Sequence, residues 1–185
     1  GSFAESLVVD ERNCIPLADS VSFIDGAFMA CVSGTIFGAL RRLEARPHEV
    51  LAVYGLGPVG LSAVILGRAM GLQVIGVDIL PERMEAAQRC GLQRIVDSTQ
   101  TDAVEAIRAY SQDHGFGNGT GADCLIETSG SAAARRLIIP SLRREGRAAS
   151  VGVSSTENVI NPSDIHGRAV RLIGSVVFPL SWLWD

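Results

Sequence analysis

Three glycines follow a short apolar run in the first third of the chain. The run is Val50–Tyr54, and Gly55, Gly57 and Gly60 follow it with the spacing GxGxxG. In dinucleotide-binding proteins the first such glycine permits a tight turn, the second removes a side chain where a pyrophosphate approaches, and the third lets a helix pack closely. The spacing alone is equally typical of a plain turn, but a preceding strand and a following helix make it a dinucleotide-binding signal.

The residues around these glycines extend the candidate site. Pro58 and Val59 complete the loop, whose backbone N–H groups would face the phosphates. No Lys-Ser/Thr pair follows Gly60, so the loop is not of the ATPase type.

An acidic residue, Asp78, ends the next apolar segment. Its carboxylate would accept hydrogen bonds from an adenosine ribose and repel a 2′-phosphate, which favours NAD over NADP. Arg83 is a second candidate for the same ribose. The alternatives are an exposed turn aspartate and a solvated helix arginine.

The elements that must position these residues alternate regularly from residue 50 onward. This alternation predicts an α/β fold with a doubly wound, six-stranded parallel sheet of the Rossmann type in a single domain. A short β-rich piece, Leu7–Val9, precedes it. The expected strands are Val50–Tyr54, Gln73–Asp78, Arg94–Asp97, Asp123–Glu127, Arg147–Val153 and Arg171–Phe178. The expected helices are 22–45, Val59–Met70, Glu82–Cys90, 102–111 and Ser131–Leu142.

Composition excludes several classes of function. The net charge is −4 and no Lys/Arg run reaches five residues, which argues against nucleic acid and anionic membrane as partners. No apolar stretch of about 18 residues is evident, so we expect no membrane span. The four cysteines are scattered without a CxxC pair, which favours a reducing, cytoplasmic setting. The three histidines lack metal-ligand spacing.

Together these motifs resemble the nucleotide-binding domain of the medium-chain dehydrogenase/reductase family, the zinc-type alcohol dehydrogenases and their relatives. The resemblance is carried by the glycine loop with Asp78, by Ala30–Thr35, by Asp123–Gly130 and by Val151–Val153. It implies that residues 1–20 connect to a catalytic domain absent from this chain, and that residues 21–185 form the dinucleotide-binding domain. It also implies that Thr128, Ser129, Val151 and Val153 flank the nicotinamide.

The resemblance gives Cys31 and Thr35 a possible role. In zinc-dependent relatives, a cysteine at the place of Cys31 is the last protein ligand of catalytic zinc, and the other ligands lie in the catalytic domain. A catalytic zinc needs three protein ligands, so Cys31 alone cannot hold the ion. Thr35 lies one helical turn further on and is our candidate catalytic residue near the nicotinamide. The alternatives are a buried helix cysteine and a helix-interior threonine.

The implied activity is hydride transfer between NAD and a small alcohol or carbonyl substrate, with zinc polarising the substrate oxygen. We expect this chain to bind NAD without turnover. The alternatives are a zinc-free reductase of the quinone-reductase kind, a methyltransferase using S-adenosylmethionine, and a non-catalytic nucleotide-binding module. An apolar C-terminal segment suggests a homodimer, or contact with the missing catalytic domain. Its large side chains are Val176, Val177, Phe178, Leu180, Trp182 and Trp184.

Overall fold

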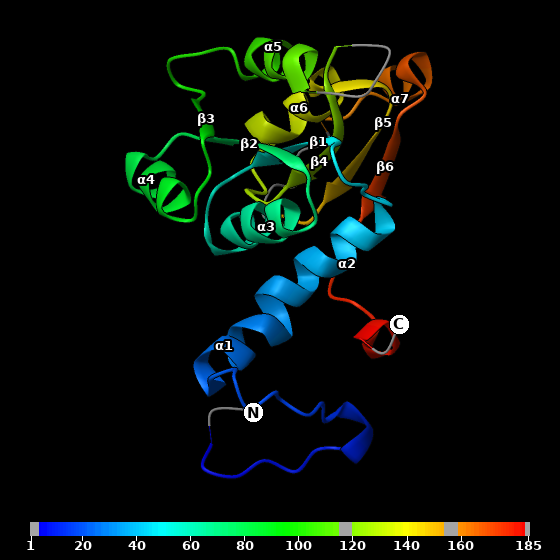
Figure 1. Cartoon of the computed structure of the whole chain (residues 1–185). Helices are drawn as coiled ribbons and strands as arrows, with labels where there is room; N and C mark the ends of the chain where they lie inside the picture. The colour runs from blue at the N-terminus through cyan, green and yellow to red at the C-terminus, as the bar shows by residue number, and fades with distance from the viewer. Residues whose placement is uncertain (1–3, 115–119, 154–158, 184–185) are drawn as a thin grey trace.

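The computed structural model describes residues 4–114, 120–153 and 159–183. Its centre is one six-stranded parallel sheet with the strand order β3-β2-β1-β4-β5-β6. The chain starts in the middle, builds outward to β3, returns beside β1 and builds outward to β6 (Figure 1). The strands are β1 (Val50–Tyr54), β2 (Gln73–Asp78), β3 (Arg94–Asp97), β4 (Ala122–Glu127), β5 (Leu142–Ser150) and β6 (Arg171–Gly174). The predicted doubly wound Rossmann fold is confirmed.

Helices cover both faces of the sheet, as the continuous burial of the central strands requires. Every residue of β1 and β4 is buried, because a parallel sheet with helices on both faces leaves no strand surface to water. One core cluster joins the sheet to α2 (Gly34–Arg42), α3 (Pro58–Ala69) and α4 (Pro81–Arg89). The other joins it to α5 (Ala103–His114), α6 (Ala132–Ser141) and α7 (Pro162–Arg168) (Figure 1).

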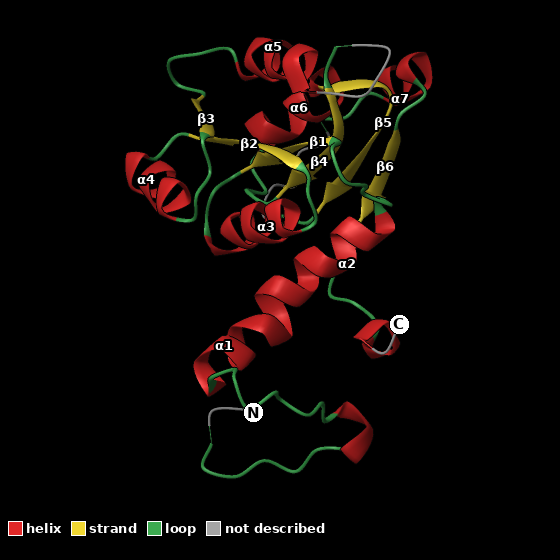
Figure 2. Cartoon of the chain, in the orientation of Figure 1, coloured by secondary structure: helices red, strands yellow, loops and turns green. Residues whose placement is uncertain are grey.

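The expected helix over residues 22–45 is present but not uniform. It consists of α1 (Phe23–Phe28), a π-helical turn (Met29–Ser33) and α2. Its C-terminal part packs on the sheet domain, whereas α1 extends away from it (Figure 2). Ile36 and Leu40 are fully buried, while Phe23 is 90% exposed.

This helix corrects one expectation from the sequence. Residues Phe23–Arg42 are long enough and apolar enough to cross a membrane, with a mean hydropathy of 1.6 over the best window. We expected no such segment, because no apolar stretch of about 18 residues is evident in the sequence. Ile36, Ala39 and Leu40 of its C-terminal part pack in the core, whereas only 28% of the apolar window as a whole is buried.

Other boundaries also differ from expectation. Residues Leu7–Val9 form no strand and are exposed. The sixth strand ends at Gly174 rather than Phe178. Strand β5 begins at Leu142 rather than Arg147 and includes an arginine-rich stretch that has no strand-like pattern. The short helix α7 was not expected from its sequence, although Asn161 caps it and Pro162 opens it.

The C-terminal segment folds back onto α2. Phe178 lies against Gly34, where any side chain larger than hydrogen would overlap the ring, and meets Phe37 edge-on with ring centroids 6.2 Å apart. Arg42 Nη1 donates to Val177 O at 3.0 Å. The guanidinium of Arg42 also lies 5.0 Å from the Trp182 ring centre, a cation–π distance.

Candidate functional site

The glycine loop lies at the carboxyl end of β1, where open parallel sheets bind ligands. Gly55 has φ of +89°, a conformation that L side chains rarely adopt. A side chain on Gly60 would overlap the carbonyl oxygen of Gly55, so α3 approaches the loop closely only because this residue is glycine. A Cβ on Gly57 would meet no atom within 4 Å. Packing therefore requires glycine at 55 and 60, whereas Gly57 leaves open space in front of the backbone.

The start of α3 presents unpaired backbone donors to that space. Gly57 is the N-cap residue, Pro58 opens the helix, and no side chain caps it. The first N–H groups of an α-helix have no intrahelical acceptor. Pro58 has no N–H, so Val59 and Gly60 supply these donors, aligned with the positive end of the helix dipole. The arrangement fits an anionic diphosphate.

Asp78 is buried at the end of β2 and only 5% exposed. One carboxyl oxygen accepts a hydrogen bond from Leu56 N at 2.5 Å, within the glycine loop. The other accepts from Ile79 N at 2.7 Å and Leu80 N at 3.0 Å. The alternative of an exposed turn aspartate is therefore wrong. Asp78 holds the loop and the strand end together, and a carboxylate has acceptor sites left for a ligand hydroxyl.

A cleft of about 350 Å³ opens beside this carboxyl group. It brings together four of the residues singled out from the sequence, namely Gly55, Asp78, Arg83 and Ser129. Arg83 reaches in from α4, with Nη1 3.9 Å from Asp78 Oδ2. The sequence did not point to Ile79 or Ser131, which also line the cleft. Ile79 follows Asp78 directly in the sequence and is 57% exposed. Its place next to the candidate ribose-binding residue could have marked it as part of the cleft.

The remaining cofactor candidates lie at the ends of β4 and β5. Thr128 Oγ1 donates to Gly55 O at 2.8 Å, so it supports the glycine loop. Val151 is half-buried against the core, and its N–H donates to Glu127 O at 2.9 Å. Val153 is 88% exposed at the same edge of the sheet. The sequence analysis did not single out the buried Glu127 as a site residue, because its neighbours indicate only that it ends a strand.

Cys31 lies in the π-helical turn, and its side chain is exposed. The alternative of a buried helix cysteine is therefore wrong. π-Helical turns within α-helices are frequent at functional sites. Thr35 follows on α2 and is half-buried. Among the residues that the structure describes, no three His, Cys, Asp or Glu side chains gather into a metal site. Cys31 thus offers one thiolate, which by itself does not fit the three-ligand requirement of a catalytic zinc.

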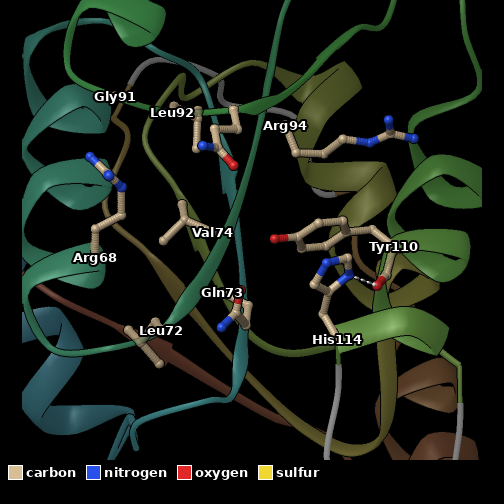
Figure 3. A pocket seen from close by; sticks show the side chains of 10 residues that line it. Arg68, Leu72, Gln73, Val74, Gly91, Leu92, Arg94, Tyr110 and His114 are labelled. Carbon is tan, nitrogen blue, oxygen red and sulfur yellow. Dashed lines mark hydrogen bonds between the residues drawn. The ribbon is translucent and has the colours of Figure 1, made fainter.

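A second cleft, of about 320 Å³, lies at the opposite edge of the sheet (Figure 3). It adjoins Gln73 and Arg94, which begin β2 and β3, and holds none of the candidate cofactor residues. Arg68 on its wall donates to Cys90 O at 2.8 Å. The stacked rings of Tyr110 and His114, with centroids 4.2 Å apart, form the other wall (Figure 3). Of these two clefts, the first lies at the carboxyl ends of the strands and the second at their amino ends.

The fold and this site place the chain among known proteins. Residues 58–182, more than half of the chain, match the family model described as zinc-binding dehydrogenase. The zinc-type alcohol dehydrogenase-like protein YphC of Escherichia coli is 35% identical over 97% of this chain and 50% of its own length. An NAD-dependent alcohol dehydrogenase of Sulfurisphaera tokodaii is 28% identical over 96% of this chain and 50% of its own length.

A solved structure agrees in fold. A zinc-binding dehydrogenase from Sinorhizobium meliloti 1021, bound to NADP, superimposes with a TM-score of 0.72 and 27% identity, over 82% of this chain and 44% of its own. The chain thus spans about half the length of the relatives it matches. By its family model, its relatives and its fold, the chain belongs to the zinc-binding dehydrogenase family.

Proposed function

We propose that this chain is the NAD-binding domain of a zinc-dependent alcohol or polyol dehydrogenase. The observation that carries the proposal is the glycine loop, which has an uncapped helix N-terminus at one end and the cleft beside the buried Asp78 at the other. One end suits a diphosphate and the other suits a ribose with free hydroxyls. A methyltransferase has no need of the diphosphate end, and membership of the dehydrogenase family argues against that alternative.

The residues of this chain would bind and orient the dinucleotide. The N–H groups of Val59 and Gly60 would hold the diphosphate, and Asp78 would accept hydrogen bonds from the adenosine ribose, with Arg83 beside it. The main chain near Val151 and Val153 would flank the nicotinamide. When bound, NAD supplies the acceptor for a hydride removed from the alcohol carbon.

The zinc part of the proposal concerns the whole enzyme. Cys31 would be one ligand, and the others would come from a catalytic domain joined through residues 1–20. Zinc would act as a Lewis acid on the substrate oxygen, and Thr35 would lie near the nicotinamide. We therefore expect NAD binding but no alcohol oxidation by residues 1–185 alone. Measurable turnover by this chain would contradict that division of labour.

The choice between NAD and NADP is the sharpest test of the site. We expect calorimetric titration of the chain to show tighter binding of NAD than of NADP, because Asp78 repels a 2′-phosphate. Asp78→Asn removes the charge and keeps one acceptor oxygen, while its NH₂ group meets N–H groups that Asp78 now accepts from, so NAD binding itself should weaken. The preference for NAD over NADP should narrow by about tenfold, or about 1.4 kcal/mol. Glu82→Gln, on the exposed first turn of α4, is the matched control. An unchanged preference in Asp78→Asn would remove this residue from the ribose site.

A further inference from the structure

A carboxyl group with no exposed surface ends the central strand β4. Glu127 is 0% exposed, and it belongs to the buried charged residues, which are rare without partners. Its Oε1 accepts a hydrogen bond from Ser129 Oγ at 2.6 Å and another from Gly130 N at 2.7 Å. Both donors lie in the loop after β4. The side chain thus turns back to hold the loop that follows it.

The other carboxyl oxygen faces an arginine on α6. Arg135 Nε lies 3.9 Å from Glu127 Oε2, and the arginine side chain is only 16% exposed. The far end of the guanidinium donates from Nη2 to Gly152 O at 2.8 Å. Gly152 belongs to the loop after β5. Arg135 therefore links the buried carboxyl group to the backbone of a second loop.

The main chain of Glu127 ties the same two loops together. Its carbonyl oxygen accepts hydrogen bonds from Val151 N and Gly152 N, both at 2.9 Å. Gly152 packs against Gly130 so closely that a Cβ on it would overlap the backbone of Gly130. The loops after β4 and β5 thus meet at Glu127, at the edge of the sheet where ligands bind.

We propose that Glu127 and Arg135 are positioning residues for the bound dinucleotide. Glu127 has no surface for a ligand to touch, so it acts through Ser129, which lines the cleft beside Asp78. Arg135 acts through Gly152, between the two valines proposed to flank the nicotinamide. This inference rests on the proposed NAD function. The competing explanation is that the pair serves stability alone.

Burial of the pair favours the positioning role. Burying two charges is costly, and apolar side chains of similar volume often stabilise a fold equally well or better. The hydrogen bonds described above lead from Glu127 to Ser129 and the backbone of Gly130, and from Arg135 to the backbone of Gly152. Between the two side chains, Nε and Oε2 lie 3.9 Å apart, an ion-pair distance without a hydrogen bond. The two buried charges therefore lie where precise loop geometry matters for binding a ligand.

The test compares a long ligand with a short one. The nicotinamide half of NADH would touch the loops after β4 and β5, whereas ADP would reach only the glycine loop and Asp78. In fluorescence and calorimetric titrations of the chain, Glu127→Gln should weaken NADH binding about tenfold. A loss of this size is at the lower end of the range expected when a group that orients binding residues is removed. ADP binding should change much less, because ADP would not reach the loops that Glu127 holds. Glu105→Gln is the matched control, because its exposed pair with Arg108 lies on α5.

A second variant and a second readout keep the outcomes distinct. Arg135→Lys retains the charge and loses the fork that reaches Gly152, so it too should weaken NADH more than ADP. Without ligand, the amide hydrogen-exchange rates of residues 128–131 and 151–153 should be higher in both variants than in the wild type. In Glu105→Gln these rates should equal those of the wild type. Lowered thermal stability with an unchanged NADH-to-ADP ratio would overturn the inference alone. A wild-type chain that binds neither ligand would overturn the proposed function as well.

Discussion

The four cysteines of the chain occupy distinct environments. Cys14 and Cys31 are exposed, Cys90 is half-buried and Cys124 is buried. Burial raises the pKa of the Cys124 thiol to about 12, although the nearby Arg147, 2.8 Å from the sulfur, acts in the opposite direction. Only the thiolate is an effective nucleophile or metal ligand. Of these four thiols, Cys31 alone combines exposure with a place beside the nucleotide-binding fold.

We therefore expect a thiol reagent to separate these residues. In the folded chain at neutral pH, Cys14 and Cys31 should react fast, Cys90 slowly, and Cys124 only after unfolding in guanidinium. Mass mapping of the labelled peptides would assign the rates, and Cys31→Ser should remove one fast thiol and leave the others unchanged. Labelling of native Cys124 at the rate of Cys31 would contradict the structure.

The buried ion pair of Glu49 and Arg147, at the amino ends of the strands, should make the free energy of unfolding depend on pH. Burial by itself would raise the pKa of Glu49, but two hydrogen bonds, from Arg147 Nη2 at 2.5 Å and from Arg46 N at 2.9 Å, together with the charge of Arg147 outweigh burial, so the pKa lies below its usual 4.5. A lowered pKa in the folded state stabilises the fold above the ordinary value. That stabilisation is lost as the pH falls below about 4.5 toward the folded-state pKa.

Glu49→Gln tests this pair. It should cost about 3 kcal/mol of unfolding free energy at pH 7, because it leaves Arg147 buried beside a neutral partner. The difference from wild type should shrink in urea titrations below about pH 4.5, where the wild-type pair is also lost. Glu44→Gln, in an exposed pair with Arg171, should change little at any pH. A constant difference between pH 3 and 7 would exclude the proposed linkage.

At the scale of elements, the turn from β1 into α3 separates packing from ligand binding. Gly60→Ala should lower stability by about 1–3 kcal/mol, because its methyl group would press on the Gly55 carbonyl. Gly57→Ala should leave thermal unfolding nearly unchanged, since φ is −68° and the Cβ meets open space. The same methyl would occupy the place proposed for the diphosphate, so NAD binding should fall at least about tenfold, or about 1.4 kcal/mol. Gly57→Ala with wild-type affinity would place the diphosphate elsewhere.

At the scale of the whole molecule, the C-terminal segment divides into two parts. Phe178 and Trp182 pack on the chain's own α2, so this part of the expected partner surface is already covered. Val176 and Val177 remain 72% and 50% exposed, next to the edge strand β6. The Leu180 side chain and Trp184 lie outside the described residues. Any interface here would centre on the valines and the free edge of β6.

We propose that this edge pairs two copies of the chain. Light scattering should then give a mass of twice the 19.5 kDa of one chain. In Val176→Asp the measured mass should fall to that of the monomer, because a charge on an edge strand blocks strand pairing. Ile65→Asp, equally apolar and 49% exposed on α3, should leave the mass unchanged. A wild-type monomer at tens of micromolar would refute the homodimer.

Local sequence determined much of this architecture. The strands β1, β2 and β3 have the bounds expected from their apolar runs, because adjacent glycines, prolines and charged residues end each run sharply. The glycine loop and Asp78 were identifiable because a tight turn between a strand and a closely packed helix allows few residue types. The ends of β5 and β6 were not, since Arg143, Arg144 and Glu145 in β5 carry no strand signal.

Contacts between distant residues decided the rest. The sequence does not show that Glu127 and Arg135 meet, that Phe178 occupies the space left by Gly34, or that Cys31 faces outward from a π-helical turn. Each outcome depends on how elements from separate parts of the chain pack against one another, whereas sequence patterns report only neighbours within a few positions. Hence the chain's sequence specified where a dinucleotide could bind, and tertiary packing specified how the loops around that place are held.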